Sequence, residues 1–165
     1  MNMKHSIFFG RIDIEYFGFE EDFVEQNIRC IPMIVRFKMD AAGVKLKLSE
    51  WSRFNPEERV ELAKRSCGGA AEVRAYRTYL IGLIQEKTGG DAAMMEVEEN
   101  PFWGQPDQVP DTLREKAREF EWDISIVQWR SLTHLQRFAL LKLCRPGHEN
   151  ENFPKAMREF GLAAE

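Results

Sequence analysis

The sequence predicts an all-α fold, a single domain made of two helical repeats that a pseudo-twofold axis relates. The main observation is that the sequence pattern recurs at an offset of 78 residues without a gap. Trp51 aligns with Trp129, and the helix-start pattern at Asn55 aligns with that at Thr133. Apolar residues recur at helical spacing around these positions, which is typical of amphipathic helices.

We expect four segments along the chain. Residues 1–18 alternate in character and contain four aromatic residues, which predicts a strand or an ordered arm packed on the body. The first helical repeat covers residues 19–87, a strap covers 88–108, and the second repeat covers 109–165. A segment as long and irregular as 88–108 commonly joins two halves or carries function.

The first repeat opens with two helical patterns. One begins at Glu20, and the other runs from Met33 to Ala42 between Pro32 and Gly43. Proline suits a first helical turn, and glycine suits the left-handed position just past a helix end. The connector 45–48 then alternates like a short strand, so it can pair antiparallel with its counterpart, residues 124–127, across the axis.

Helix capping gives the strongest local signals. Asn55 is an N-cap residue with Pro56 after it, and Glu58 can reach back to the Asn55 amide as a capping box. Thr133 and Gln136 repeat this box with different residues. We expect Trp51 and Trp129, just before the boxes, to be core residues rather than a paired binding surface.

Three further helices complete the predicted fold. A long amphipathic helix follows Gly69 and ends at Thr88-Gly89. The helix over residues 135–144 is apolar nearly all round, which places it at the centre. A short closing helix carries Phe153, Met157 and Phe160.

Composition excludes several classes of protein. A formal net charge of −4 disfavours nucleic acid and anionic membranes as partners, because both attract clustered positive charge. No apolar run approaches the length that spans a bilayer, and the start lacks a secretory apolar segment. Three widely spaced cysteines form no disulfide framework, so we expect a reduced, cytoplasmic protein. An internal twofold can replace a homodimer, which mildly favours a monomer.

The residues show no catalytic or metal motif. Cys144 and His148 have a ligand-like spacing, but a closed zinc site needs two more ligands. The polar segment from Arg145 to Phe153 is a titratable loop or an ordinary helix-terminating turn. Phosphate-binding, nucleophile-elbow and zinc-protease motifs are missing from the sequence. We therefore expect no catalytic residues, no metal and no cofactor.

Several segments together form a pattern that covers most of the chain: Phe19–Val24, Arg29–Met33, Val35–Asp40, Gly43–Leu48 with Trp51, Glu86–Gly89, Leu135–Leu140 and Arg145–Asn150 with Asn152-Phe153. On these segments the chain resembles the nitrate reductase-associated protein family from about Phe17 to Leu162, which leaves the first sixteen residues outside the pattern. The resemblance implies association with nitrate assimilation in bacteria, where a member helps nitrate reductase become active, and it assigns no catalytic residues.

Three hypotheses of function follow. The first is a non-catalytic accessory protein that binds nitrate reductase during maturation. The second is a cofactor- or sulfur-handling protein in which Cys30 or Cys144 acts with His148 and Glu149, which requires a thiol with a lowered pKa. The third is a helical interaction module with another partner. The candidate partner-binding residues are Arg145, His148, Glu149, Asn150, Asn152, Cys30, Arg36, Lys38, Phe102 and Trp103.

Overall fold

The computed structural model describes residues 7–8, 11–21, 30–145 and 151–164. The described chain is mostly helical, which confirms the predicted class, and a small antiparallel sheet accompanies the helices. The chain divides between Glu98 and Glu99 into two compact units, 1–98 and 99–165. In the part of the chain that the structure describes, no helix combines the length and apolarity needed to span a bilayer.

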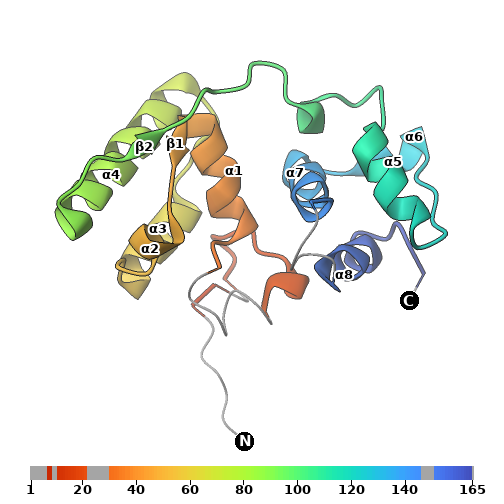
Figure 1. The fold of residues 1–165 in the computed structure, drawn as a ribbon, viewed down its shortest axis with the longest axis horizontal. Helices are drawn as coiled ribbons and strands as arrows, with labels where there is room; N and C mark the ends of the chain where they lie inside the picture. Colours follow the sequence, from red (N-terminus) through yellow and green to blue (C-terminus); the bar gives the residue numbers. More distant parts are fainter. Residues whose placement is uncertain (1–6, 9–10, 22–29, 146–150, 165) are drawn as a thin grey trace, which may run out of the picture. The chain divides into compact units, whose positions relative to one another are not determined.

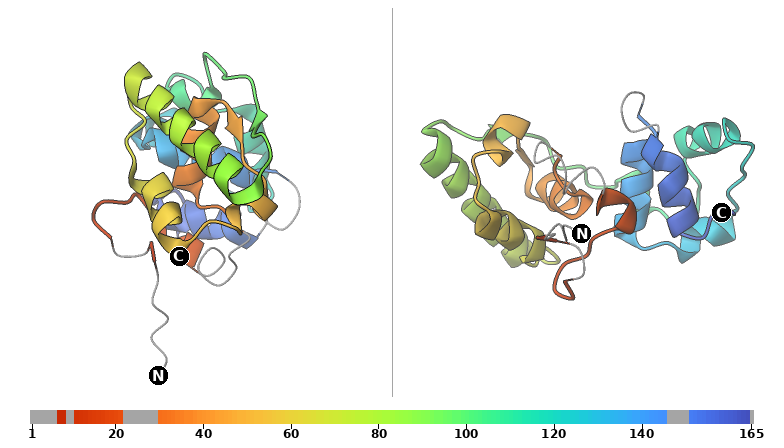
Figure 2. Two further views of the ribbon diagram at one scale, coloured as in Figure 1. Left: turned by 90° about the vertical axis from the view of Figure 1, so that its left-hand side faces the viewer. Right: turned by 90° about the horizontal axis from the view of Figure 1, so that it is seen from below.

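Unit 1 is built around helix α1, which packs against α3 and the long helix α4 (Figures 1 and 2). The predicted bounds of α1 and its glycine cap are confirmed, since Gly43 has φ 71°. Tyr76, Leu80 and Ile84 of α4 are fully buried, as their helical spacing predicts. The elements are η1 (Gly18–Glu20), α1 (Met33–Ala42), β1 (Val44–Lys45), α2 (Leu48–Trp51), α3 (Pro56–Lys64), α4 (Ala70–Thr88) and β2 (Ala93–Met94).

Unit 2 is built around helix α7, which packs against η3, α5 and α8 (Figure 1). This agrees with the nearly all-apolar pattern of that helix, because both Leu140 and Leu143 are completely buried. Phe153 and Met157 of the predicted closing helix are also buried. The elements are η3 (Phe102–Gly104), α5 (Asp111–Arg118), α6 (Ile126–Ser131), α7 (His134–Leu143) and α8 (Asn152–Glu159).

The offset found in the sequence recurs in the local structure. Helices α1 and α5, α2 and α6, and α3 and α7 begin at positions that are 78 residues apart in each pair. The indole rings of Trp51 and Trp129 are buried, with 1% and 0% exposure, which confirms the core prediction. The two units thus place the same three helix starts around an equivalent tryptophan. A common repeat and a twofold axis between the units stay predictions.

The predicted capping boxes are present. The Glu58 amide donates to Asn55 Oδ1 at 2.8 Å, and the Asn55 amide donates to Glu58 Oε1 at 2.9 Å. Thr133 and Gln136 make the same reciprocal pair at 3.1 and 2.9 Å. Each pair satisfies two backbone donors that a helix leaves unpaired at its start.

The predicted pairing of the two connectors is wrong. Strand β1 pairs instead with β2 in the strap, with Val44 opposite Met94 and Lys45 opposite Ala93. The second connector forms the start of helix α6 instead of a strand, because the Ser125 hydroxyl and the Gln128 side chain form a capping box there. A local capping signal outweighs a two-residue strand pairing, and the strap supplies the partner for β1 after α4 ends at Gly89.

The described part of the N-terminal arm packs on unit 1 and contains no strand. Phe8 and Ile14 are buried, and the Phe8 ring lies 6.5 Å from that of Trp51. Residues 22–29, where a helical pattern was predicted from Glu20, lie outside the described residues. The completely buried Glu20 carboxylate accepts the Met33 amide at 2.7 Å and so caps the start of α1.

Candidate functional site

The strap (residues 88–108) carries the largest share of exposed apolar side chains in the described chain. Met94, Met95, Val97 and Phe102 are all exposed there, and Phe102 keeps 60% of its surface in water. Trp103, the second aromatic predicted as a partner contact, is half-buried and lies with its ring 5.2 Å from the ring of His134. Of the two side chains, Phe102 is the more exposed, and the role of both as partner contacts stays a prediction.

The segment after α7 is described only at its ends. Arg145 is exposed just past the helix, and Asn152 is half-buried at the first position of α8. The predicted residues His148, Glu149 and Asn150 lie outside the described residues. Their role as partner contacts therefore stays a prediction.

The third predicted group lies at the start of α1 and along it. Cys30 is half-buried just before the helix, while Arg36 and Lys38 are half-buried on it. The Lys38 ammonium donates to Ala63 O at 2.7 Å and to Arg65 O. These carbonyls end α3, so Lys38 acts as a cationic cap that ties α1 to α3.

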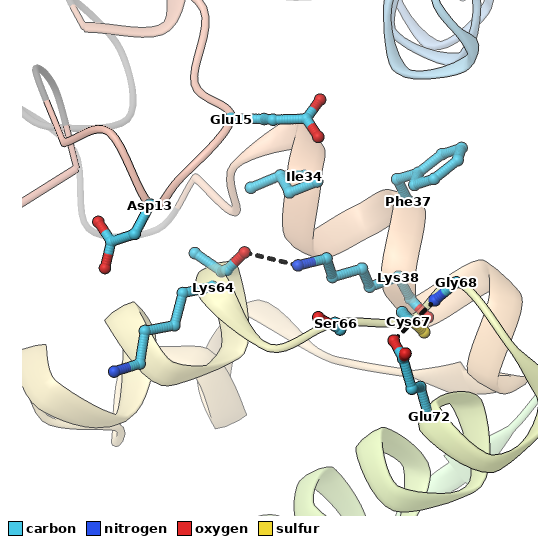
Figure 3. A pocket seen from close by; sticks show the side chains of 11 residues that line it. Asp13, Glu15, Ile34, Phe37, Lys38, Lys64, Ser66, Cys67, Gly68 and Glu72 are labelled. Atoms are coloured by element: carbon cyan, nitrogen blue, oxygen red, sulfur yellow. Dashed lines mark hydrogen bonds between the residues drawn. The ribbon is translucent and has the colours of Figure 1, made fainter.

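A pocket of about 360 Å³ lies beside this lysine within unit 1 (Figure 3). Residues of the arm, of α1 and of the segment that joins α3 to α4 form its walls. Both signs of charge occur in the lining, and the Glu72 carboxylate accepts the Gly68 amide at 3.2 Å. The lining residues are Asp13, Glu15, Ile34, Phe37, Lys38, Ala63, Lys64, Ser66, Cys67, Gly68 and Glu72.

The two groups in the pocket with nucleophilic potential, Lys38 and Cys67, both donate hydrogen bonds to backbone carbonyls. Burial lowers the pKa of Lys38, but both of its recorded acceptors are backbone carbonyls. Burial raises the pKa of the Cys67 thiol, although the charge of Lys38 acts in the opposite direction. A thiol needs a lowered pKa to react as a thiolate. The pocket therefore has no activated nucleophile among these two groups.

Cys144, the cysteine that the sulfur-handling hypothesis uses, is also poorly suited to thiolate chemistry. Burial raises the pKa of its thiol to about 12, and the nearby Lys116 offsets only part of this effect. The direction is opposite to that of reactive cysteines, whose thiolates are stabilised by positive charge. The structure thus provides no support for Cys144 as a nucleophile.

The pH dependence of alkylation tests the raised pKa of the Cys144 thiol. In a Cys30→Ser, Cys67→Ser background, we expect the rate of Cys144 modification by iodoacetamide to keep rising with pH beyond pH 10. The reason is that the thiol stays protonated until the pH approaches its raised pKa of about 12. An inflection near neutral pH would contradict the burial argument and would restore the sulfur-handling hypothesis. The urea-unfolded protein serves as the control, with an inflection near the ordinary thiol value of about 8.5.

Two buried arginines that were not among the predicted site residues, Arg59 and Arg137, contact the equivalent tryptophans Trp51 and Trp129. Arg59 donates to the carbonyls of Trp51 and Ser52 at 3.4 and 3.2 Å, and its guanidinium lies 5.4 Å from the Trp51 ring centre. Burial lowers the pKa of Arg59. With these two bonds the arginine caps the end of α2.

Arg137 repeats this arrangement in unit 2 and extends it to the strap. It donates to the carbonyls of Trp129 and Arg130, both at 3.0 Å, and to the Trp103 carbonyl at 3.2 Å. Its guanidinium lies 5.3 Å from the Trp129 ring centre. The signal in the sequence was an arginine at both positions 59 and 137, at the same offset of 78.

Metal binding finds no support among the described residues, which contain no group of three or more His, Cys, Asp or Glu side chains able to hold an ion. The functional features that the structure does show are an exposed apolar strap and internal cationic caps.

Comparison with known proteins gives one match. The family model described as conserved nitrate reductase-associated protein matches residues 16–160, which is most of the chain. No curated protein and no solved structure matches. Because this match covers most of the chain, the chain belongs to the nitrate reductase-associated protein family.

Proposed function

We propose that the protein is a non-catalytic accessory protein of nitrate assimilation, which binds nitrate reductase and helps its maturation in the cytoplasm. Membership of the family associates the chain with nitrate reductase. The binding itself, the maturation role, the cytoplasmic location and the monomeric state belong to the proposal.

The observation that carries the proposal is the exposed strap. Among the described residues, seven large apolar side chains are exposed, and four of them, Met94, Met95, Val97 and Phe102, belong to the strap. Apolar groups gathered in one exposed segment indicate an interaction surface more than scattered ones do. Methionine side chains adapt to different partner shapes, which suits a protein that meets an immature form of its target.

The strap is also acidic. Asp91, Glu96, Glu98, Glu99 and Asp107 are exposed, and residues 88–108 contain no lysine, arginine or histidine. Asp107 is paired with Arg130 of α6 at 3.0 Å, whereas the other four acids precede the η3 turn. An acidic segment steers an oppositely charged partner and disfavours partners of like charge. The combination favours a partner site that is apolar and basic. Arg145 with Asn152, and Cys30 with Arg36, are secondary candidate contacts.

A pull-down tests this function. Purified protein is immobilised and offered nitrate reductase from the same source, in cofactor-free and mature forms. We expect selective capture of the cofactor-free form, because a maturation factor should release its product. Equal capture of both forms would contradict the maturation role but retain the association. Capture of neither would contradict the proposal and favour a helical module with another partner.

A further inference from the structure

The turn at η3 is fixed to unit 2 by contacts on its inner side. Arg137 Nη1 donates to Trp103 O at 3.2 Å, and Trp129 Nε1 donates to Gln105 O at 2.8 Å. The Trp103 ring lies 5.2 Å from the ring of His134, the first residue of α7. The two donors are buried side chains, so the turn is attached to the core of the unit.

Bonds within the turn fix its own shape. The Gly104 amide donates to Pro101 O at 3.0 Å, and the Gln105 amide donates to Phe102 O at 3.1 Å. Gln105 Nε2 also donates to Asn100 O at 3.0 Å. A turn closed by its own bonds and tied to the core loses little conformational entropy when a partner binds.

This fixed turn leaves one large side chain in water. Phe102 is 60% exposed, whereas its neighbour Trp103 is half-buried against α7. An exposed phenylalanine on a fixed backbone has the properties of an interface anchor, since aromatic side chains bury much area at a low cost in rotamer entropy. More than half of the Phe102 surface is therefore available to a partner.

We propose that Phe102 is the anchor residue of a docking surface on unit 2, and that it inserts into an apolar pocket with a basic rim on nitrate reductase. This inference rests on the proposed function. The basic rim follows from charge complementarity with the acids on the N-terminal side of the turn, because Glu98 and Glu99 are exposed shortly before Phe102. Asp107, on the other side of the turn, is paired with Arg130 at 3.0 Å. The acids contribute to the association rate, and the ring contributes to the lifetime of the complex.

Binding kinetics test the anchor. Wild-type protein and Phe102→Ala are compared for binding to the reductase form captured in the pull-down. We expect Phe102→Ala to weaken binding about 30-fold or more, mainly through faster dissociation. Val127→Ala is the matched control, because Val127 is an equally exposed apolar residue of unit 2, at 70%, on α6. Thermal unfolding of both variants should match the wild type.

A charge variant tests the basic rim. Glu98→Gln with Glu99→Gln should slow association severalfold at low salt and reduce the dependence of the association rate on salt. The control pair, Glu86→Gln with Glu115→Gln, changes the net charge equally on α4 and α5 and should leave the rate close to that of the wild type.

The outcomes separate the two levels of the proposal. If Phe102→Ala and Val127→Ala both bind the reductase as tightly as the wild type does, the anchor is overturned and the accessory function is retained. Equal effects of the two charge variants would overturn the basic rim. Loss of binding confined to Phe102→Ala, with unchanged thermal unfolding, would support the anchor. Absence of wild-type binding to either reductase form would overturn the accessory function and the anchor together.

Discussion

Replacing Trp129 by alanine is expected to lower the free energy of unfolding by about 4 kcal/mol, the range seen for large aromatic residues removed from a core. The ring is completely buried, so the substitution leaves a cavity that the neighbouring helices cannot fill without moving. It also removes the hydrogen bond to Gln105 O at 2.8 Å and the ring beneath the guanidinium of Arg137. Urea unfolding followed by circular dichroism measures the loss.

Trp129→Phe separates these contributions. Phenylalanine keeps much of the ring volume but lacks the indole N–H, so we expect a smaller loss of about 2 kcal/mol from the missing bond and the smaller ring. Trp51→Ala provides the matched variant in unit 1. A loss below about 1 kcal/mol for Trp129→Ala would contradict the role of this ring as a core residue of unit 2.

Replacing Arg137 by methionine is expected to cost about 3 kcal/mol of unfolding free energy. Methionine keeps much of the side-chain length, but it leaves the carbonyls of Trp129, Arg130 and Trp103 without their donor. Hydrogen bonds from a charged group contribute about 1.5–3 kcal/mol each. The expected loss is smaller than the sum of three such bonds, because water can donate to some of the carbonyls that lose the arginine. Chemical unfolding of the purified variant measures this cost.

The equivalent change in unit 1, Arg59→Met, is the control. Arg59 donates to two carbonyls at longer distances of 3.4 and 3.2 Å, so its loss should cost about 1–2 kcal/mol. Arg137→Met should also weaken binding to nitrate reductase, because the Trp103 carbonyl that fixes the η3 turn loses its donor. Equal stability losses for the two variants would contradict the additional role of Arg137 in holding the strap.

Features set by neighbouring residues were predictable from the sequence. The bounds of α1, the capping boxes at Asn55 and Thr133, and the end of α4 at Gly89 all follow from side chains within four residues of the helix terminus. The burial of Trp51 and Trp129 was also predictable, because two large aromatic residues recur at the same offset before each box. In the candidate site, the strap could be identified by its lack of periodicity and its acidic, apolar composition.

Features set by residues far apart in the chain were not predictable in the same way. The strand partner of β1 is β2, about fifty residues later, and the matched connectors suggested a different partner. Lys38 was a candidate partner-binding residue, and the capping of α3 by its ammonium beside Cys67 could not be predicted from its position in the sequence. The exposure of Phe102 beside a half-buried Trp103 could not be read from two adjacent aromatic residues.

The sequence by itself determined the helical class, the helix starts and stops and the internal correspondence, because these depend on short-range backbone hydrogen bonding and on periodicity. The tertiary structure decided which carbonyls Arg59, Arg137 and Lys38 satisfy, how strongly burial raises the pKa of the Cys144 thiol, and which strap residues face water. Those outcomes depend on contacts between segments that are distant in the chain. A long cationic or aromatic side chain can be satisfied by many partners, and packing alone selects one of them.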